Sequence, residues 1–140
     1  MPQEFSAGAV IFRKENGRKL YLLLHYESKH WDFVKGHIEL DENEEQTVVR
    51  ETYEETGISE LGFIPGFREK IEYFFRQEGK TIHKQVIFLL AETNTKDVTL
   101  SFEHIGFEWL PYEEALGRLT FENAKDILKK ANAFLEARNE

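Results

Sequence analysis

Three short runs of the chain carry apolar side chains at nearly every position, namely 7–12, 20–24 and 86–91. Strands that are apolar on both faces are typical of a sheet that is covered on both sides, whereas half-exposed strands alternate between apolar and polar residues. Helices must supply the two covers. The pattern therefore predicts an α/β (α+β) sandwich with a mixed β-sheet between helices.

The apolar positions after residue 120 recur at helical spacing and predict a helix that packs on one side. Its stripe consists of Ala124, Ile127, Leu128, Ala131, Phe134 and Leu135. Thr120 offers a cap-like signal at its start, and a shorter helix is expected over 112–116. Another helix is predicted from about Asn43 to Thr56, since Gly57 suits the left-handed position that ends a helix. Between 63 and 75 we expect a strand pair or one long curved strand.

Composition narrows the class of protein. The 140 residues fit one domain, 1–140, and a hydrophobic content of 41% supports a buried core. The net charge of −8 argues against binding to duplex nucleic acid. No segment predicts a membrane span, and the lack of cysteine fits a reducing cytoplasm, where we expect the protein to act as a monomer.

The predicted helix over 43–56 concentrates acids on one side. At 100° per residue, its glutamates fill one arc of about 100°; these are Glu44, Glu51, Glu54 and Glu55. Carboxylates at this spacing repel one another, and three of them lie near the C-terminal end, where the helix dipole disfavours anions. A bound divalent cation such as Mg²⁺, Mn²⁺ or Ca²⁺ would neutralise them. A solvated acidic face is the alternative, and geometry alone leaves both open.

A spaced motif runs from residue 36 to residue 58. It consists of Gly36, five residues, Glu42, seven residues, Arg50-Glu51, two residues, Glu54-Glu55, one residue and Gly57-Ile58. This motif resembles the complete Nudix box, the signature of hydrolases that cleave nucleoside diphosphates linked to another moiety. The resemblance implies a Nudix-type α/β/α sandwich over essentially the whole chain. Thr52 and Val34 depart from the family pattern, although neither is an implied ligand.

The resemblance also implies roles for the residues of the box. Glu51 and Glu55 would be the main ligands of Mg²⁺, with Mn²⁺ as an alternative, and Glu54 would be a further ligand or the base that deprotonates water. Gly36 would allow close backbone approach and could lend a carbonyl group to the metal. Arg50 would orient a carboxylate of the box through an ion pair.

Residues outside the box resemble one subfamily. The segment 31–37, which reads Trp-Asp-Phe-Val-Lys-Gly-His, and the Glu103-His104 pair before Trp109 are similar to the dinucleoside tetraphosphate hydrolases. The implied reaction cuts diadenosine tetraphosphate into ATP and AMP by attack of water on phosphorus. Glu103 would be a metal ligand or general base if its loop folds over the helix, and otherwise an ordinary loop acid.

Such a substrate needs cations for its phosphates. From residue 68 to residue 84 there are five Lys/Arg and three Glu, a local charge of +2 in an acidic chain. Lys35, Lys80 and Lys84 are the candidates for phosphate contacts, because lysines suit a flexible polyphosphate as point charges. For each, the alternative is a solvated surface lysine.

The substrate also needs flat apolar surfaces for its purines. Tyr73 and Phe121 are the first candidates for stacking on a base, with Tyr26 and His30 as alternates. An isolated aromatic side chain is more often part of the core. Two other functions stay open: a Nudix pyrophosphohydrolase that acts on triphosphate-end RNA or nucleoside triphosphates, and a non-catalytic nucleotide-binding module.

Overall fold

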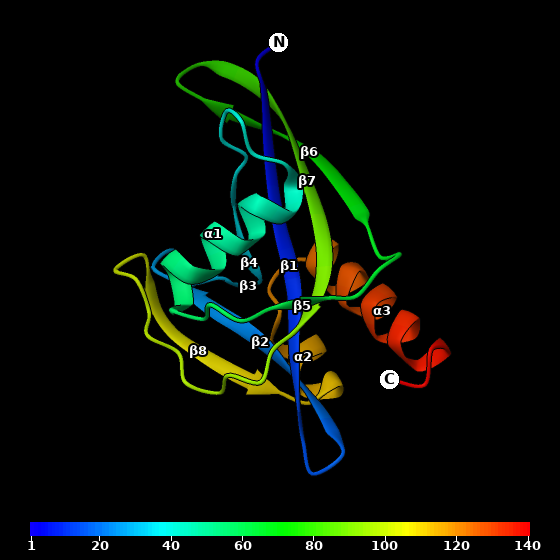
Figure 1. Cartoon of the computed structure of the whole chain (residues 1–140). Helices are drawn as coiled ribbons and strands as arrows, with labels where there is room; N and C mark the ends of the chain where they lie inside the picture. Colours follow the sequence, from blue (N-terminus) through cyan, green and yellow to red (C-terminus); the bar gives the residue numbers. More distant parts are fainter.

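The computed structural model describes residues 1–140 and places one mixed sheet between two layers of helix (Figure 1). The strands are β1 Gln3–Glu15, β2 Arg18–Tyr26, β3 Trp31–Asp32, β4 Val34–His37, β5 Gly62–Phe63, β6 Glu69–Gln77, β7 Lys80–Glu92 and β8 His104–Leu110. The helices are α1 Glu44–Thr56, α2 Tyr112–Arg118 and α3 Glu122–Ala137. The three predicted buried strands are confirmed as the inner parts of β1, β2 and β7.

The long strand β1 changes partners along its length. It runs parallel to β7 on one side, and all the other strand pairs in the sheet are antiparallel. On its other side it pairs with β2 from Phe12 onward, but with β4 from Ser6 to Ala9. The short strand β4 therefore lies where β1 and β2 separate, and it brings the segment before α1 to the middle of the molecule.

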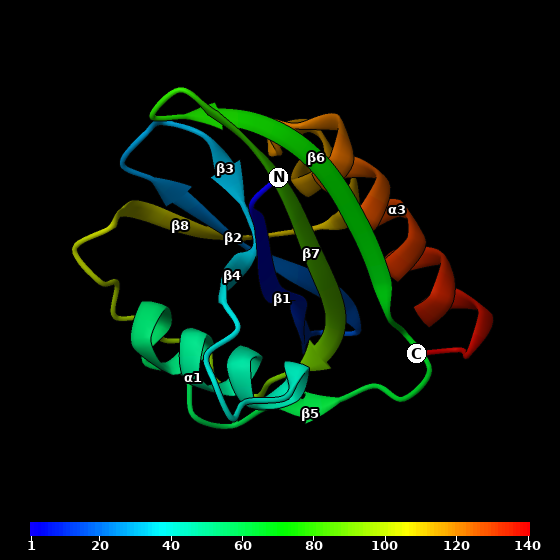
Figure 2. The ribbon, with the colours of Figure 1, turned by 90° about the horizontal axis from the view of Figure 1, so that it is seen from above.

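The helices cover opposite faces of the sheet, as Figure 2 shows with α1 on one side and α3 on the other. Alternate residues of β1 enter two separate cores: Ala7, Ala9 and Ile11 face the α1 side, whereas Val10 and Phe12 face α2 and α3. This alternation explains why the strands read as apolar on both faces, and it confirms the predicted sandwich.

Local signals fix both ends of α1. The Asn43 side chain accepts a hydrogen bond from the Gln46 backbone, and the Gln46 side chain accepts one from the Asn43 backbone, both at 2.8 Å. Gly57 adopts φ = 77°, the left-handed conformation that the sequence predicts. The buried side of the helix includes Val48 and, unusually, Glu55.

Two predictions about local structure need correction. Thr120 does not cap α3, because Phe121 is the residue before the helix and the Thr120 hydroxyl accepts a hydrogen bond from the Trp31 backbone at 2.8 Å. The region from 63 to 75 contains β5 and β6, but each of them pairs with β7 rather than with the other. The strand β1 occupies one edge of β7, so β5 and β6 lie one after the other along its opposite edge, and a local pattern does not reveal that their partner comes later in the sequence.

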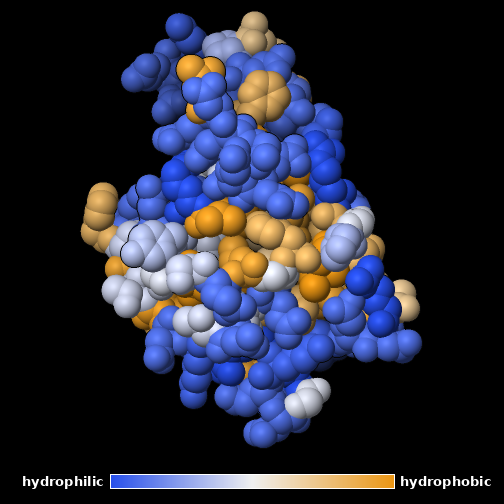
Figure 3. All heavy atoms as spheres, viewed as in Figure 1, coloured by the Kyte–Doolittle hydropathy of each residue, from blue (hydrophilic) through white to orange (hydrophobic).

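The surface seen in Figure 3 is mostly hydrophilic, with a band of apolar side chains across the middle of that face. Several large apolar side chains elsewhere are also exposed, including Leu40 and Phe102. None of the three helices has the length and apolar character needed to cross a membrane.

Candidate active site

The strand β4 and the helix α1 touch at a glycine. A Cβ atom added to Gly36 would lie 2.0 Å from Cδ of Glu51, so that any other residue would collide with this carboxylate. Gly36 therefore lets the Glu51 side chain lie directly against the backbone of β4. Its suggested role as a carbonyl ligand stays a prediction.

Arg50 connects α1 to the loop that precedes it. Its Nε atom donates to Glu42 at 2.6 Å, and its other nitrogens donate to Glu51 at 3.0 Å, to Glu54 at 3.1 Å and to the His37 carbonyl oxygen at 2.9 Å. The hydrogen bond from Arg50 lowers the pKa of Glu42 to about 2. Arg50 thus holds two of the candidate ligands and the preceding loop in one network.

Glu55 is the most enclosed acid of the site. Only 6% of the residue is exposed, and its Oε1 atom is buried without a hydrogen-bond partner. Burial raises the pKa of the Glu55 carboxyl far above the ordinary value, and the neighbouring carboxylates of Glu51 and Glu103 raise it further. A divalent cation would reverse this balance, because nearby positive charge favours the ionised form.

The segment between β7 and β8 folds over the end of α1. Its backbone donates from Thr99 to the Thr56 carbonyl oxygen at 2.9 Å and from Ser101 to the Glu55 carbonyl oxygen at 3.3 Å. Glu103 therefore reaches a cavity of about 400 Å³ that Glu51 and Glu55 also line. We call this the carboxylate cavity; its walls include Ser6, Tyr26, Lys35, Gly36, Glu51, Glu55, Tyr73, Lys84 and Glu103.

The three candidate lysines fall into two groups. Lys35 and Lys84 line the carboxylate cavity, where their ammonium groups lie 3.1 Å from Asp32 and 3.3 Å from Glu4. Burial lowers the pKa of Lys84. Lys80 instead lies at the tip of the β6–β7 hairpin, four residues or about 13 Å farther along the strand, and does not line the carboxylate cavity. The structure does not bring Lys80 to the candidate site.

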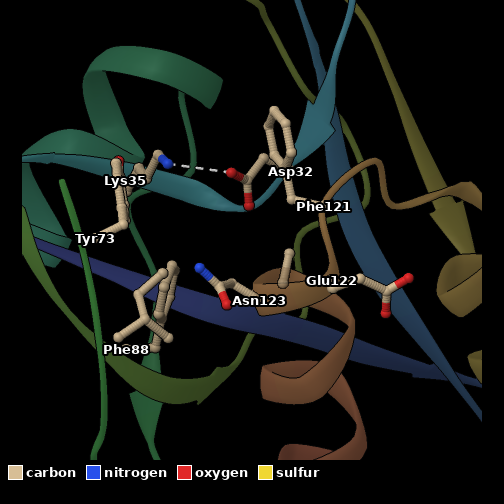
Figure 4. Close-up of a pocket in the computed structure, with 9 residues that line it drawn as sticks. Asp32, Lys35, Tyr73, Phe88, Phe121, Glu122 and Asn123 are labelled. Carbon is tan, nitrogen blue, oxygen red and sulfur yellow. Dashed lines mark hydrogen bonds and ion pairs between the residues drawn. The ribbon is translucent and has the colours of Figure 1, made fainter. Parts of the chain in front are cut away.

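A second cavity, of about 370 Å³, adjoins the first and contains both first-choice aromatic residues. Figure 4 shows Tyr73 and Phe121 on opposite sides of it, with the Asp32–Lys35 ion pair between them. We call it the aromatic pocket; its walls are Asp32, Lys35, Ile71, Tyr73, Phe88, Phe121, Glu122, Asn123 and Ala124. Lys35 and Tyr73 line both cavities, so the two cavities adjoin at these side chains.

The two alternate aromatic candidates stack on each other instead of lining the aromatic pocket. The rings of Tyr26 and His30 are 4.5 Å apart and nearly parallel, and the Tyr26 hydroxyl donates to the Phe33 carbonyl oxygen at 2.7 Å. The His30 ring lies 5.3 Å from that of Phe121. His30 therefore covers one face of the Tyr26 ring, and a role of either residue in stacking on a base stays a prediction.

The donor set fits a hard divalent cation. The candidate acids supply oxygen alone, which Mg²⁺ and Mn²⁺ prefer, and the buried Glu55 carboxylate is paired with no lysine or arginine. No three acidic or histidine side chains converge on one point as they stand. The carboxylates repel one another and Arg50 holds Glu51 and Glu54, so these acids would have to shift toward one another around an ion.

Sequence reasoning missed His104 and Ser6. The His104 side chain is 1% exposed and lies 3.4 Å from Glu55, and the buried Ser6 hydroxyl has no hydrogen-bond partner at the wall of the carboxylate cavity. His104 adjoins Glu103 in the sequence, which was the available hint, but its contact with Glu55 depends on how the loop folds.

Comparison with known proteins identifies relatives of the whole chain. The NUDIX domain matches residues 2–131. The chain is 38% identical to a mouse bis(5'-nucleosyl)-tetraphosphatase [asymmetrical], over 93% of this chain and 94% of that protein. It is 36% identical to the Caenorhabditis elegans protein of the same name, over 93% and 95% of the two chains.

A solved structure extends the similarity to three dimensions. A crystal structure of a C. elegans Ap4A hydrolase binary complex superposes with a TM-score of 0.84 at 34% identity and covers 96% of this chain and 98% of that chain. The sequence motif, the sandwich and the superposition all indicate the same family of hydrolases.

Proposed function

The chain belongs to the Nudix hydrolase family, and on that premise we propose that it cleaves dinucleoside polyphosphates, with diadenosine tetraphosphate cut into ATP and AMP. The observation that carries this proposal is that a cavity lined by carboxylates and lysines adjoins a pocket lined by aromatic side chains. Lys35 and Tyr73 line both the carboxylate cavity and the aromatic pocket. A substrate with a purine at one end and a long phosphate chain would occupy both cavities together.

The aromatic pocket would hold one adenine. Tyr73 and Phe121 offer ring faces to the base, and stacking of this kind contributes about 1–3 kcal/mol per base. Phosphates that leave the pocket meet Lys35 first and Lys84 farther into the carboxylate cavity. These lysines would fix the chain and offset its negative charge near the glutamates.

Mg²⁺, or Mn²⁺ in its place, would be held by Glu51 and Glu55 with help from Glu54 and Glu103, and when bound it neutralises the polyphosphate and acidifies the attacking water. Arg50 would keep Glu51 and Glu54 oriented through its hydrogen bonds. Glu54 or Glu103 would accept the proton of the water, since both carboxylates are more accessible than Glu55.

The water would attack the fourth phosphorus, counted from the adenosine whose base is gripped. The bond that breaks joins the fourth phosphorus to the oxygen that links it to the third phosphorus. ATP departs with that oxygen, and the fourth phosphorus stays in AMP. Lys35 or Lys84 would stabilise the charge that develops on the departing phosphate. No covalent bond between enzyme and substrate is required.

Hydrolysis in ¹⁸O-water tests this function. With Mg²⁺ we expect equal amounts of ATP and AMP, the label in AMP, and no product after chelation of the metal. Two molecules of ADP, or label in ATP, would contradict the proposed cleavage. Faster turnover of triphosphate-end RNA or nucleoside triphosphates would favour the related pyrophosphohydrolase, and tight binding without products would favour a binding module.

The proposal extends to the chain as a whole. We propose that residues 1–140 act as one Nudix domain and work as a monomer in the cytoplasm. The family match over residues 2–131 supports a single domain, and the complete lack of cysteine fits a reducing compartment. Sedimentation of the purified chain would test the monomer, with twice the expected mass as the contradicting result.

A further inference from the structure

His104 and Glu55 face each other with unused hydrogen-bonding atoms. The His104 Nε2 atom lies 3.4 Å from Glu55 Oε1. Both atoms are buried, and neither has a hydrogen-bond partner within the protein. Buried polar groups that remain unpaired are costly, so two that face each other at this separation call for an explanation.

The His104 ring is held in place on its other sides. Its Nδ1 atom lies 3.0 Å from the Ser101 hydroxyl, and its ring meets that of Tyr26 edge-on at 4.5 Å. The pairing of β8 with β2 sets His104 opposite Tyr26. When Ser101 donates to Nδ1, the neutral imidazole carries its proton on Nε2, the ring nitrogen that lies 3.4 Å from Glu55 Oε1.

Glu55 has no other donor to orient it. Arg50, the cation of the network, directs its hydrogen bonds to Glu42, Glu51, Glu54 and the His37 carbonyl oxygen, but none to Glu55. Lys35 and Lys84 are paired with Asp32 and Glu4. His104 is therefore the side chain whose donor is available to the buried oxygen of Glu55.

We propose that His104 is a positioning residue that donates from Nε2 to Oε1 of Glu55 and so leaves the second carboxylate oxygen free for a divalent cation. This inference rests on the proposed function, because it assigns Glu55 to the metal site. Hydrogen-bonded partners that orient metal ligands commonly change metal affinity by about 10–100-fold when they are removed.

Binding of Mn²⁺ alone, followed by electron paramagnetic resonance, tests this role without relying on catalysis. His104→Leu removes the donor and should weaken Mn²⁺ binding by about 10–100-fold. His104→Gln can place an amide N–H near the position of Nε2 and should retain affinity within about 3-fold of the wild type, since the donor is kept. His25→Leu is the matched control, because His25 stacks on Trp31 away from the carboxylates and its loss should leave binding unchanged.

A second pair of variants protects the test from a folding defect in His104→Leu. In His104→Asn the amide is too short to reach Glu55, although it can still meet Ser101. We therefore expect folded His104→Asn to bind Mn²⁺ as weakly as the leucine variant, and His104→Gln to bind more tightly. Equal affinities for the asparagine and glutamine variants, or wild-type affinity in folded His104→Leu, would overturn the inference.

The same measurement separates this inference from the proposed function. If the wild type binds Mn²⁺ but cleaves no dinucleoside polyphosphate, the proposed function fails while the variants still test His104. If the wild type cleaves diadenosine tetraphosphate and folded His104→Leu binds Mn²⁺ equally well, the role of His104 fails and the function stands. A wild type that binds no Mn²⁺ would overturn both.

Discussion

The carboxylate cavity and the aromatic pocket share two side chains, but different interactions hold them in place. The first is built on α1, whose ends are capped and whose Arg50 makes hydrogen bonds to three acids. The second is lined by side chains from β6, β7 and the start of α3, with the Asp32–Lys35 pair as the hydrogen bond between residues of its wall. Under the proposed function, the first cavity would fix the reacting groups, whereas the second would recognise the substrate by contact area.

The largest expected effect is the loss of a charge from the carboxylate cavity. Glu55→Gln should lower kcat by about 10²–10⁴-fold, because charge stabilisation by a bound cation contributes several kcal/mol and each 1.4 kcal/mol is tenfold. Steady-state kinetics with diadenosine tetraphosphate measures this effect. Glu45→Gln, on the exposed start of α1, is the control and should keep the wild-type rate. A near-normal rate in Glu55→Gln would show that Glu55 is not a ligand of the catalytic cation.

The lysines test how far the site extends along β7. Lys84→Met should lower kcat/KM by about 10- to 150-fold, since a hydrogen bond from a charged group is worth about 1.5–3 kcal/mol. Lys80→Met should change it by less than about 2-fold, because an exposed charge 13 Å away is largely screened. Parallel kinetics of the two variants measures the difference. Equal losses would show that the hairpin tip contacts the phosphates after all.

The aromatic pocket should respond in KM more than in kcat. Tyr73→Ala removes one stacking face and should raise KM by about 5- to 150-fold, which corresponds to 1–3 kcal/mol. Phe74→Ala is the matched control, because Phe74 is the next residue of β6, is exposed and stacks on His83. A loss confined to kcat in Tyr73→Ala would argue against a role in holding the base.

The smallest expected effect concerns stability without metal. A buried carboxyl with a raised pKa costs nothing below the unfolded pKa of about 4.5, and it destabilises the fold progressively as the pH rises toward its folded pKa. At pH 8, metal-free Glu55→Gln should therefore be more stable than the wild type, and its advantage should grow from pH 4 to pH 8. Urea unfolding at pH 4 and pH 8 measures this, and an advantage that does not grow with pH would contradict it.

Features of the site that depend on a few neighbouring residues were predictable from the sequence, whereas contacts between distant segments were not. The end of helix α1 was predicted because Gly57 acts within the last turn, and its start was predicted to within one residue, although the capping role of Asn43 was not. The separation of Lys80 from Lys84 was hidden, since it depends on where β7 meets the site. The contact between His104 and Glu55 joins residues 49 positions apart, and no local pattern reports it.

The residues proposed to bind the substrate also combine features that the sequence predicts with features that it does not. Tyr73 and Phe121, the first candidates, line the same pocket, whereas the alternates Tyr26 and His30 pack against each other, and no local pattern reports either arrangement. The cluster of positive charge over 68–84 is largely paired in the fold: Arg68 binds Glu44, Lys70 binds Glu72 and Lys84 binds Glu4. Sequence proximity could not reveal these partners.

The central claim is that the glutamates of α1 hold divalent cations against a polyphosphate whose base lies between Tyr73 and Phe121. Crystals grown with Mn²⁺ and a non-hydrolysable dinucleoside tetraphosphate would test it by anomalous scattering. We expect manganese peaks at Glu51 and Glu55, in contact with phosphate oxygens, and one adenine in the aromatic pocket. A bound nucleotide with no manganese at these carboxylates would contradict the account.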